Sequence, residues 1–139
     1  MIVLDTNVVS EIIGPSPAKA VLDWFENRDT DELRLTSITK AELLFGIECL
    51  PQGRKRDQLK MLVDEFLNLL GHEVLSFAGE HAAVYAAIAA GRRSRGRPVG
   101  ELDAQIAAIA RLGGFSVATR NVKDFADCGI EIINPWDAA

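Results

Sequence analysis

Short apolar runs alternate along the chain with longer segments in which apolar residues recur every three or four positions. Short runs of this kind predict buried strands, and the longer spacing predicts helices that turn one face to a core. Five strands are expected, at residues 2–5, 33–36, 73–77, 115–119 and 131–133. Helices are expected between them, at residues 7–13, 18–27, 39–49, 54–70, 80–90 and 102–112.

The order of these elements predicts the fold class. Strands separated by helices imply parallel pairing, because a parallel pair needs a crossover connection, which is usually a helix. We therefore expect an α/β fold, a three-layer α/β/α sandwich around a central, mostly parallel sheet. No linker-like stretch divides the chain, so residues 1–139 are expected to form a single domain.

Composition and charge narrow the class of protein. The chain is 48% hydrophobic and 25% charged, with a net charge of −5, which is typical of a globular protein and argues against coating of nucleic acid over the whole surface. Cys49 and Cys128 lack a CxxC spacing, which favours a reduced, cytoplasmic protein. No apolar run reaches the roughly 18 residues of a membrane span, and no signal peptide is recognisable, so no membrane partner is expected.

Polar residues follow several of the expected strands. Ligands of an open parallel sheet bind beyond the carboxyl ends of its strands. Asp5 ends the first strand, Glu42 lies on the first turn of the helix after the second, and Asp103 begins the helix that leads into the fourth. The fourth strand is followed by Arg120, Asn121 and Asp124. We therefore expect these side chains to converge on one edge of the sheet.

Each of these residues also has a purely structural interpretation. Asp5 is a good helix cap, and the segment from Thr39 to Glu42 fits the capping-box pattern. Asp103 can interact with a helix dipole, and Asn121 and Asp124 suit turns. Helices start at both edges of such a sheet, so residues that only cap helices should be found at both edges. These acids map to one edge, which favours a functional site.

Carboxylates that share an edge predict a metal site. At about 4–5 Å and an effective dielectric near 20, each pair repels by a few kcal/mol, so a cation or a retained proton is needed. Oxygen ligands suit Mg²⁺ or Mn²⁺, and such a cation can orient and activate water for phosphodiester hydrolysis without a covalent intermediate. His72 and His81 are not spaced for a zinc cluster, and His81 is expected at the surface or in the core.

Two basic runs could neutralise an anionic polymer beside these acids. The first, at residues 54–60, is interpreted as a solvated helix face. The second, GRRSRGRP, immediately precedes Asp103 and is either another solvated face or a phosphate-binding segment. Its candidate phosphate-binding residues are Arg93, Arg95 and Arg97.

Four segments in order resemble a known family. The opening IVLDTNVVSE, the segment SITKAELLFGI, the helix DAQIAAIA and the turn ATRNVKDF are together similar to PIN-domain ribonucleases. More narrowly, they resemble the VapC-type toxins of bacterial toxin–antitoxin pairs, close to the FitB-like branch, and the terminal INPW adds to this resemblance. The resemblance covers nearly the whole chain.

The resemblance implies a PIN-like fold, endonucleolytic cleavage of RNA with Mg²⁺ or Mn²⁺, a homodimer, and a cognate VapB-type antitoxin. By position, Asp5, Glu42 and Asp103 match the acidic site of the family. Asp5 and Asp103 would be the principal metal ligands, and Glu42 would support the metal or its water. Arg93, Arg95 or Arg97 would then guide the RNA.

One position departs from the acidic pattern of the family. Asn121 stands where a fourth acid is expected, so it offers an amide oxygen but no charge. Asp124 could compensate for the missing charge, and Thr6 and Thr119 are expected to form hydrogen bonds within the site. The departure leaves open whether one or two metal ions bind.

Two rival functions remain at this point. One is a phosphatase with Asp5 as its nucleophile, which is weakened because the second acid of a D-x-D motif is replaced by Asn7. The other is a non-catalytic module that binds RNA or antitoxin without cutting. Phosphate trapped on Asp5 would identify the first, and RNA binding without cleavage the second.

Overall fold

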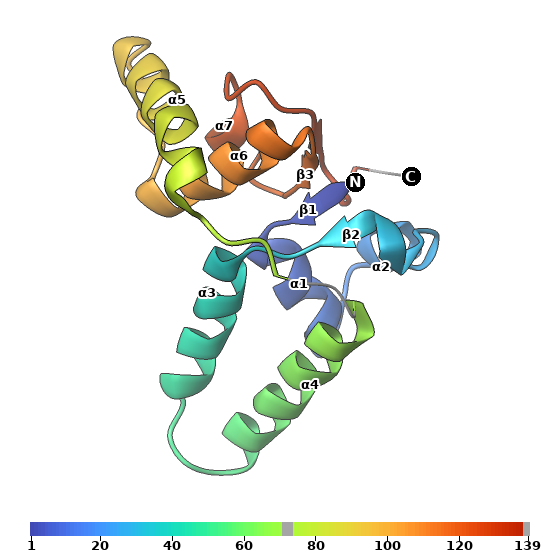
Figure 1. The fold of residues 1–139 in the computed structure, drawn as a ribbon. Helices are drawn as coiled ribbons and strands as arrows, with labels where there is room; N and C mark the ends of the chain where they lie inside the picture. The colour runs from blue at the N-terminus through green and yellow to red at the C-terminus, as the bar shows by residue number, and fades with distance from the viewer. Residues whose placement is uncertain (71–73, 138–139) are drawn as a thin grey trace.

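A parallel sheet lies in the middle of the computed structural model, which describes residues 1–70 and 74–137 (Figure 1). In the described residues the sheet has four strands in the order β2-β1-β3-β4, and every pairing is parallel. The strands are β1 at Ile2–Leu4, β2 at Leu33–Arg34, β3 at Ser116–Ala118 and β4 at Ile132–Ile133. The expected strands at these four places are confirmed.

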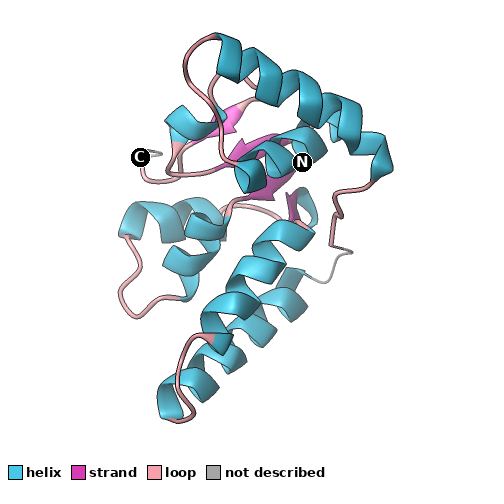
Figure 2. Ribbon diagram, turned by 90° about the vertical axis from the view of Figure 1, so that its left-hand side faces the viewer, coloured by secondary structure: helices cyan, strands magenta, loops and turns pink. Residues whose placement is uncertain are grey.

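Side-chain alternation along the strands produces two cores. Ile2 and Leu4 pack into one, whereas Val3 and Val117 pack into the other, because successive residues of a strand point to opposite faces. One face is covered by α1 (Thr6–Ile13), α2 (Lys19–Glu26), α4 (Arg54–Leu70) and most of α3 (Ser37–Glu48). The other is covered by α5 (Ala82–Ser94), α6 (Glu101–Gly113) and α7 (Val122–Phe125). Figure 2 shows the sheet between these two helical layers, so the expected three-layer sandwich is confirmed.

Helix α3 begins earlier than the sequence pattern predicts. The hydroxyl oxygen of Thr36 accepts a hydrogen bond from the backbone N–H of Thr39 at 3.2 Å, so Thr36 is the N-cap and Thr39 already lies inside the helix. The capping-box interpretation from Thr39 to Glu42 is therefore wrong. Glu42 lies in the second turn rather than the first, and its carboxylate is available for another role.

The strand expected at residues 73–77 is wrong over residues 74–77. Leu75 forms only an isolated parallel bridge with Thr36, with its N–H donating to the carbonyl of Leu35 at 2.9 Å and its carbonyl accepting from the N–H of Ser37 at 2.7 Å. The pairing stops there because Ser37 starts α3 and the chain turns away. Residue 73, and Gly71 where the preceding helix was expected to end, lie outside the described residues.

Several short elements complete the fold. Helix α5 continues to Ser94 rather than residue 90 and so takes in Arg92 and Arg93, and α7 stands where a turn was expected. Two 3₁₀ helices, η1 (Thr30–Glu32) and η2 (Gly79–His81), were not predicted. His81 is buried and its Nδ1 accepts from the N–H of Ala78 at 3.0 Å, which places it in the core. Over the described residues, each helix is too short or too polar to cross a bilayer.

Candidate functional site

Asp5 lies at the carboxyl end of β1 and is 5% exposed. Its N–H donates to the carbonyl of Ala118 at 2.9 Å, which extends the β1–β3 pairing by one bond. Its Oδ1 accepts from the N–H of Thr6 at 2.8 Å, so the side chain does cap α1. Its Oδ2 accepts from the hydroxyl of Thr119 at 2.8 Å and from the amide of Asn7 at 3.2 Å. Capping therefore uses one oxygen, and the second is held at the junction of two strands.

Thr119 and Asn7 join the ends of β1 and β3. Besides donating to Asp5, the buried Thr119 hydroxyl oxygen accepts from the N–H of Asn121 at 3.0 Å. The Asn7 amide also lies 3.3 Å from this oxygen, and its carbonyl oxygen accepts from the N–H of Arg120 at 3.3 Å. These bonds fix the backbone that follows β3 beside Asp5. The predicted hydrogen bonding of Thr119 within this region is present.

Thr6 connects the same edge to α3. Its Oγ1 lies 2.9 Å from Oε1 of Glu42 and 3.0 Å from Oγ1 of Thr39. The single hydroxyl proton of Thr6 goes to the stronger acceptor, the carboxylate, and Thr39 then donates to Thr6. Glu42 on α3 is in this way bonded to the residue that directly follows Asp5.

Asp103 lies in the first turn of α6 and is partly buried. Burial, followed by the negative charges of Asp5, Asp124 and Glu42, raises the pKa of this carboxyl to about 6. The pKa is raised although a helix N-terminus by itself favours an anion. Acidic side chains from three other parts of the chain thus lie close enough to Asp103 to act on its carboxyl group.

Asp5 responds to its surroundings in the same direction. Burial raises the pKa of its carboxyl, and the charge of Asp124 adds to the rise, while the hydrogen bonds from Thr119 and Thr6 lower the pKa by a smaller amount. Asp124 is exposed on α7, so the interpretation of this residue as a simple turn residue is wrong. Asn121 precedes α7, and its side chain makes no capping bond to that helix.

The acids are gathered but not clustered as ready-made ligands. Among residues 1–70 and 74–137, no three His, Cys, Asp or Glu side chains lie close enough together to form a preformed metal cluster. Mg²⁺ is usually held by only one or two carboxylates and retains several waters. An all-oxygen set of repelling charges fits such a hydrated divalent cation, with Asp5 and Asp103 as the principal candidate ligands.

The raised pKa of Asp103 predicts how stability depends on pH without metal. The folded protein holds a proton on this group up to about pH 6, whereas the unfolded chain releases it near 3.8, so stability falls as pH rises between these values. In chelator, the free energy of unfolding of Asp103→Asn is expected to exceed that of the parent by a margin that grows from pH 4 to pH 6.5. The margin should reach about 1–2 kcal/mol after solvent screening at this partly exposed side chain is allowed for.

Urea unfolding at a series of pH values measures this margin. Glu101→Gln is the matched control, because Glu101 is an exposed acid in the same turn of α6. If the difference in free energy of unfolding between Asp103→Asn and the parent stayed constant with pH, the pKa of Asp103 would not be raised in the folded protein.

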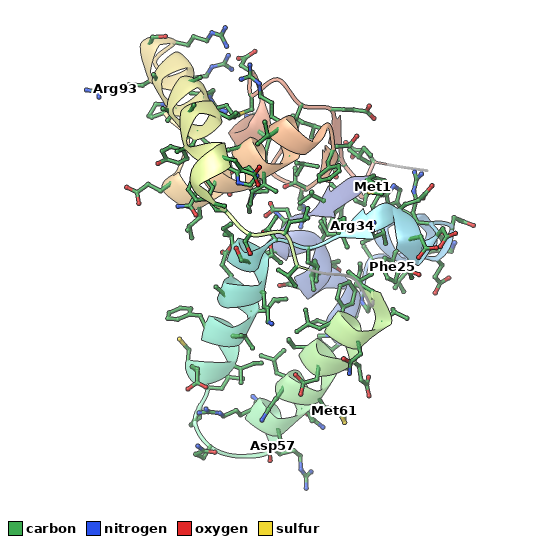
Figure 3. The ribbon with its side chains drawn as sticks, in the orientation of Figure 1. Met1, Phe25, Arg34, Asp57, Met61 and Arg93 are labelled. Atoms are coloured by element: carbon green, nitrogen blue, oxygen red, sulfur yellow. The ribbon has the colours of Figure 1, made fainter. Side chains whose placement is uncertain are left out.

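The arginine run is divided between three environments. Arg97 and Arg95 lie 2.7 and 3.8 Å from the carboxylate of Asp127, so both are already paired. Arg93 is exposed at the outer end of α5 and points away from the body of the molecule (Figure 3). Arg92 is buried and serves the fold. RNA binding by Arg93, Arg95 or Arg97 stays a prediction.

Sequence reasoning gave no site role to three residues near this edge, Asn7, Arg120 and Trp136. Asn7 bonds to Asp5 and to the backbone of Arg120. Arg120 lies on the ring of Trp136, with its guanidinium carbon 5.1 Å from the ring centroid. The available signals were the position of Arg120 directly after a strand and the tryptophan in the terminal INPW.

Comparisons with known proteins agree on one family. The sequence model described as "PIN domain" matches residues 2–130. The chain is 41% identical to "VapC ribonuclease Y4jK" of Sinorhizobium fredii over 100% of both chains. It is 35% identical to "Toxin FitB" of Neisseria gonorrhoeae, over 98% of this chain and 99% of the relative. The solved structure "FitAB bound to IR36 DNA fragment" superposes with a TM-score of 0.94 at 33% identity, covering 100% of this chain and 98% of the other.

Proposed function

The chain belongs to the PIN-domain family, and from this premise we propose that it is a metal-dependent endoribonuclease, the toxin of a VapBC-type toxin–antitoxin pair. The observation that carries the proposal is that Asp5, Glu42 and Asp124 all lie close enough to Asp103, at the carboxyl edge of the sheet, to raise its pKa. Relatives that span the whole chain are named as a ribonuclease and as a toxin, which supports RNA as the substrate.

Each acid has a role that follows from its placement. Asp5 and Asp103 would hold the divalent cation, Mg²⁺ or Mn²⁺, because they are the two acids whose pKa values are raised by burial and by neighbouring charge. A bound divalent cation would supply Lewis-acid chemistry at the phosphate and lower the pKa of its water. Glu42 is oriented by Thr6, so its second oxygen is available to accept a proton from an attacking water.

Asn121 and Asp124 together replace the fourth acid of the family pattern. The N–H of Asn121 is fixed on Thr119, which leaves its side-chain amide to contribute a neutral oxygen at the rim. Asp124 contributes negative charge, since it raises the pKa of both Asp5 and Asp103. This division of oxygen and charge favours one firmly held metal ion, with any second ion bound more weakly.

The partners are RNA, a cognate VapB-type antitoxin and a second copy of the chain. The similarity to "Toxin FitB" and to the FitAB complex supports the antitoxin. The homodimer is supported by apolar side chains left exposed on α3 and α6, where Phe45 is 69%, Leu102 50% and Leu44 41% exposed. We place the protein in the cytoplasm, where its RNA substrate is found.

Metal-dependent cleavage of RNA is the direct test. Purified protein is expected to cut bulk transfer and ribosomal RNA at discrete positions with Mg²⁺ or Mn²⁺, to stop in chelator, and to recover when the metal is returned. Products are resolved on denaturing gels. Cutting that continues unchanged in chelator would contradict the proposal, and RNA binding without any cutting would favour the non-catalytic module.

A further inference from the structure

Arg120 differs from the other arginines near the acidic edge in what holds its side chain. It follows β3 directly, its N–H donates to Asn7, and its guanidinium lies over the ring of Trp136 at 5.1 Å from the centroid. Asn7 in turn donates to Asp5, so the backbone of Arg120 is two hydrogen bonds away from this buried acid. The side chain is exposed, whereas the Trp136 ring is half-buried.

The partner of the Arg120 guanidinium is an aromatic ring, although Arg120 directly follows β3 at the carboxyl edge of the sheet. Within residues 1–70 and 74–137, Arg120 makes no ion pair, although Asp5, Asp103 and Asp124 all lie at the same edge. The aromatic face attracts the guanidinium and replaces a carboxylate as its partner. Stacking on a ring leaves the N–H groups at the edge of the guanidinium plane free to donate to another anion.

We propose that Arg120, held on Trp136, binds the RNA phosphate next to the one that is cleaved. The inference rests on the proposed ribonuclease function and names the residue of this site that receives the substrate backbone. A guanidinium presents parallel donors that match two phosphate oxygens, and restriction by the ring reduces the entropy that is lost on binding. Trp136 is a positioning residue that acts through Arg120.

Charge distribution favours Arg120 over the arginine run that the sequence suggested. Arg95 and Arg97 would have to exchange Asp127 for phosphate, and Arg93 projects from the far end of α5 (Figure 3). Arg120 lies at the carboxyl edge itself and has no carboxylate to give up. An anionic strand that approaches four acids needs a cation at this place to offset repulsion.

The test uses Arg120→Gln and a control that the fold itself supplies. Arg28 also lies over a tryptophan, with its guanidinium 5.2 Å from the centroid of Trp24. It precedes β2 and therefore belongs to the opposite edge of the sheet. Arg28→Gln removes the same charge from the same kind of pair, so it corrects for non-specific effects of net charge.

Steady-state cleavage of a labelled RNA hairpin that contains a mapped cut site separates binding from chemistry. Arg120→Gln is expected to raise KM about tenfold and to change kcat less than about twofold, because the lost bond is made to a phosphate that does not react. The plot of log(kcat/KM) against log[salt] should become shallower by about 0.7 for the one lost phosphate contact. Arg28→Gln should change neither quantity.

Two further variants test the role of the ring. Trp136→Leu is expected to raise KM by severalfold, and Trp136→Phe, which keeps an aromatic face, should restore most of the loss. In the Arg120→Gln background, Trp136→Leu should add little, because the positioned group is already absent. Additive effects of the two substitutions would show that Trp136 does not act through Arg120.

RNA binding, measured separately, distinguishes failure of this inference from failure of the proposed function. Anisotropy of fluorescein-labelled transfer RNA is measured with Mg²⁺ in the Asp103→Asn background, so that no strand is cut. If the parent cuts RNA and Arg120→Gln behaves like Arg28→Gln, the inference is overturned and the function stands. If the parent does not cut, the proposed function fails; binding weakened tenfold by Arg120→Gln alone would still support Arg120 as an RNA-phosphate contact at this edge, and absent or Arg120-independent binding would overturn that contact as well.

Discussion

Asp103→Asn is expected to lower the rate of RNA cleavage at least about a hundredfold while the protein stays folded. The substitution keeps the size and one oxygen of the side chain but removes the charge that would hold a divalent cation opposite Asp5. It also relieves repulsion from Asp5, Asp124 and Glu42, so the variant should be no less stable than the parent in chelator. Cleavage is followed on denaturing gels, and folding by circular dichroism and thermal melting.

Glu101→Gln provides the control for this substitution. Glu101 begins the same helix two residues earlier and is exposed, and the charges that raise the pKa of Asp103 are those of Asp5, Asp124 and Glu42. Replacing Glu101 therefore changes net charge and helix-dipole interactions but not the site. Cleavage should stay within about twofold of the parent. If Asp103→Asn cut RNA as fast as Glu101→Gln, the assignment of Asp103 to the metal site would be refuted.

The convergence of the acids could be predicted because it depends on topology alone. Parallel strands place their carboxyl ends at one edge, so Asp5 and the residues after β3 had to lie together once parallel pairing was inferred. Helix α4 was predicted with its observed bounds, Arg54 to Leu70, because glycine, proline and a regular apolar face all agree there.

Predictions that depended on choosing between equivalent signals were less successful. Thr36 and Thr39 are both acceptable caps, and only the tertiary structure shows that Thr36 is used, because Leu75 bonds on both sides of it. The segment at 74–77 is apolar enough for a strand, but only one residue of the neighbouring segment, Thr36, is free to pair with it. The local sequence indicates whether a segment tends to be extended, but it does not show how many residues of a neighbouring strand can pair with it.

Side-chain networks at the site were beyond prediction from the sequence. That Thr6 orients Glu42, or that Asn7 bridges Asp5 and Arg120, depends on contacts between residues that are 33 to 113 positions apart. The arginine run shows the same limit. Its four cations look alike in sequence, yet one is buried, two are paired with Asp127, and one is in solvent.

The buried member of that run, Arg92, fixes the segment that carries Asp124. Its Nε donates to the carbonyl of Arg97 at 2.7 Å, and one terminal nitrogen donates to the carbonyls of Asp124 and Ala126 at 2.9 and 2.8 Å. Helix α7 has only four residues, too few to be stable alone, so these bonds at its carboxyl end hold it against α5. Arg92 is 5% exposed and could not be replaced by solvent without opening this contact.

Arg92→Met is therefore expected to lower the free energy of unfolding by about 2–4 kcal/mol, because methionine fills similar space but removes the guanidinium that bonds the carbonyls of Arg97, Asp124 and Ala126. Arg93→Met, one residue further along α5 and exposed, should change it by less than about 0.5 kcal/mol. Arg92→Lys should recover less than half of the loss, since one ammonium cannot reach carbonyls on both sides. Urea titration followed by circular dichroism measures all three, and equal midpoints for Arg92→Met and Arg93→Met would show that α7 is held by its apolar contacts alone.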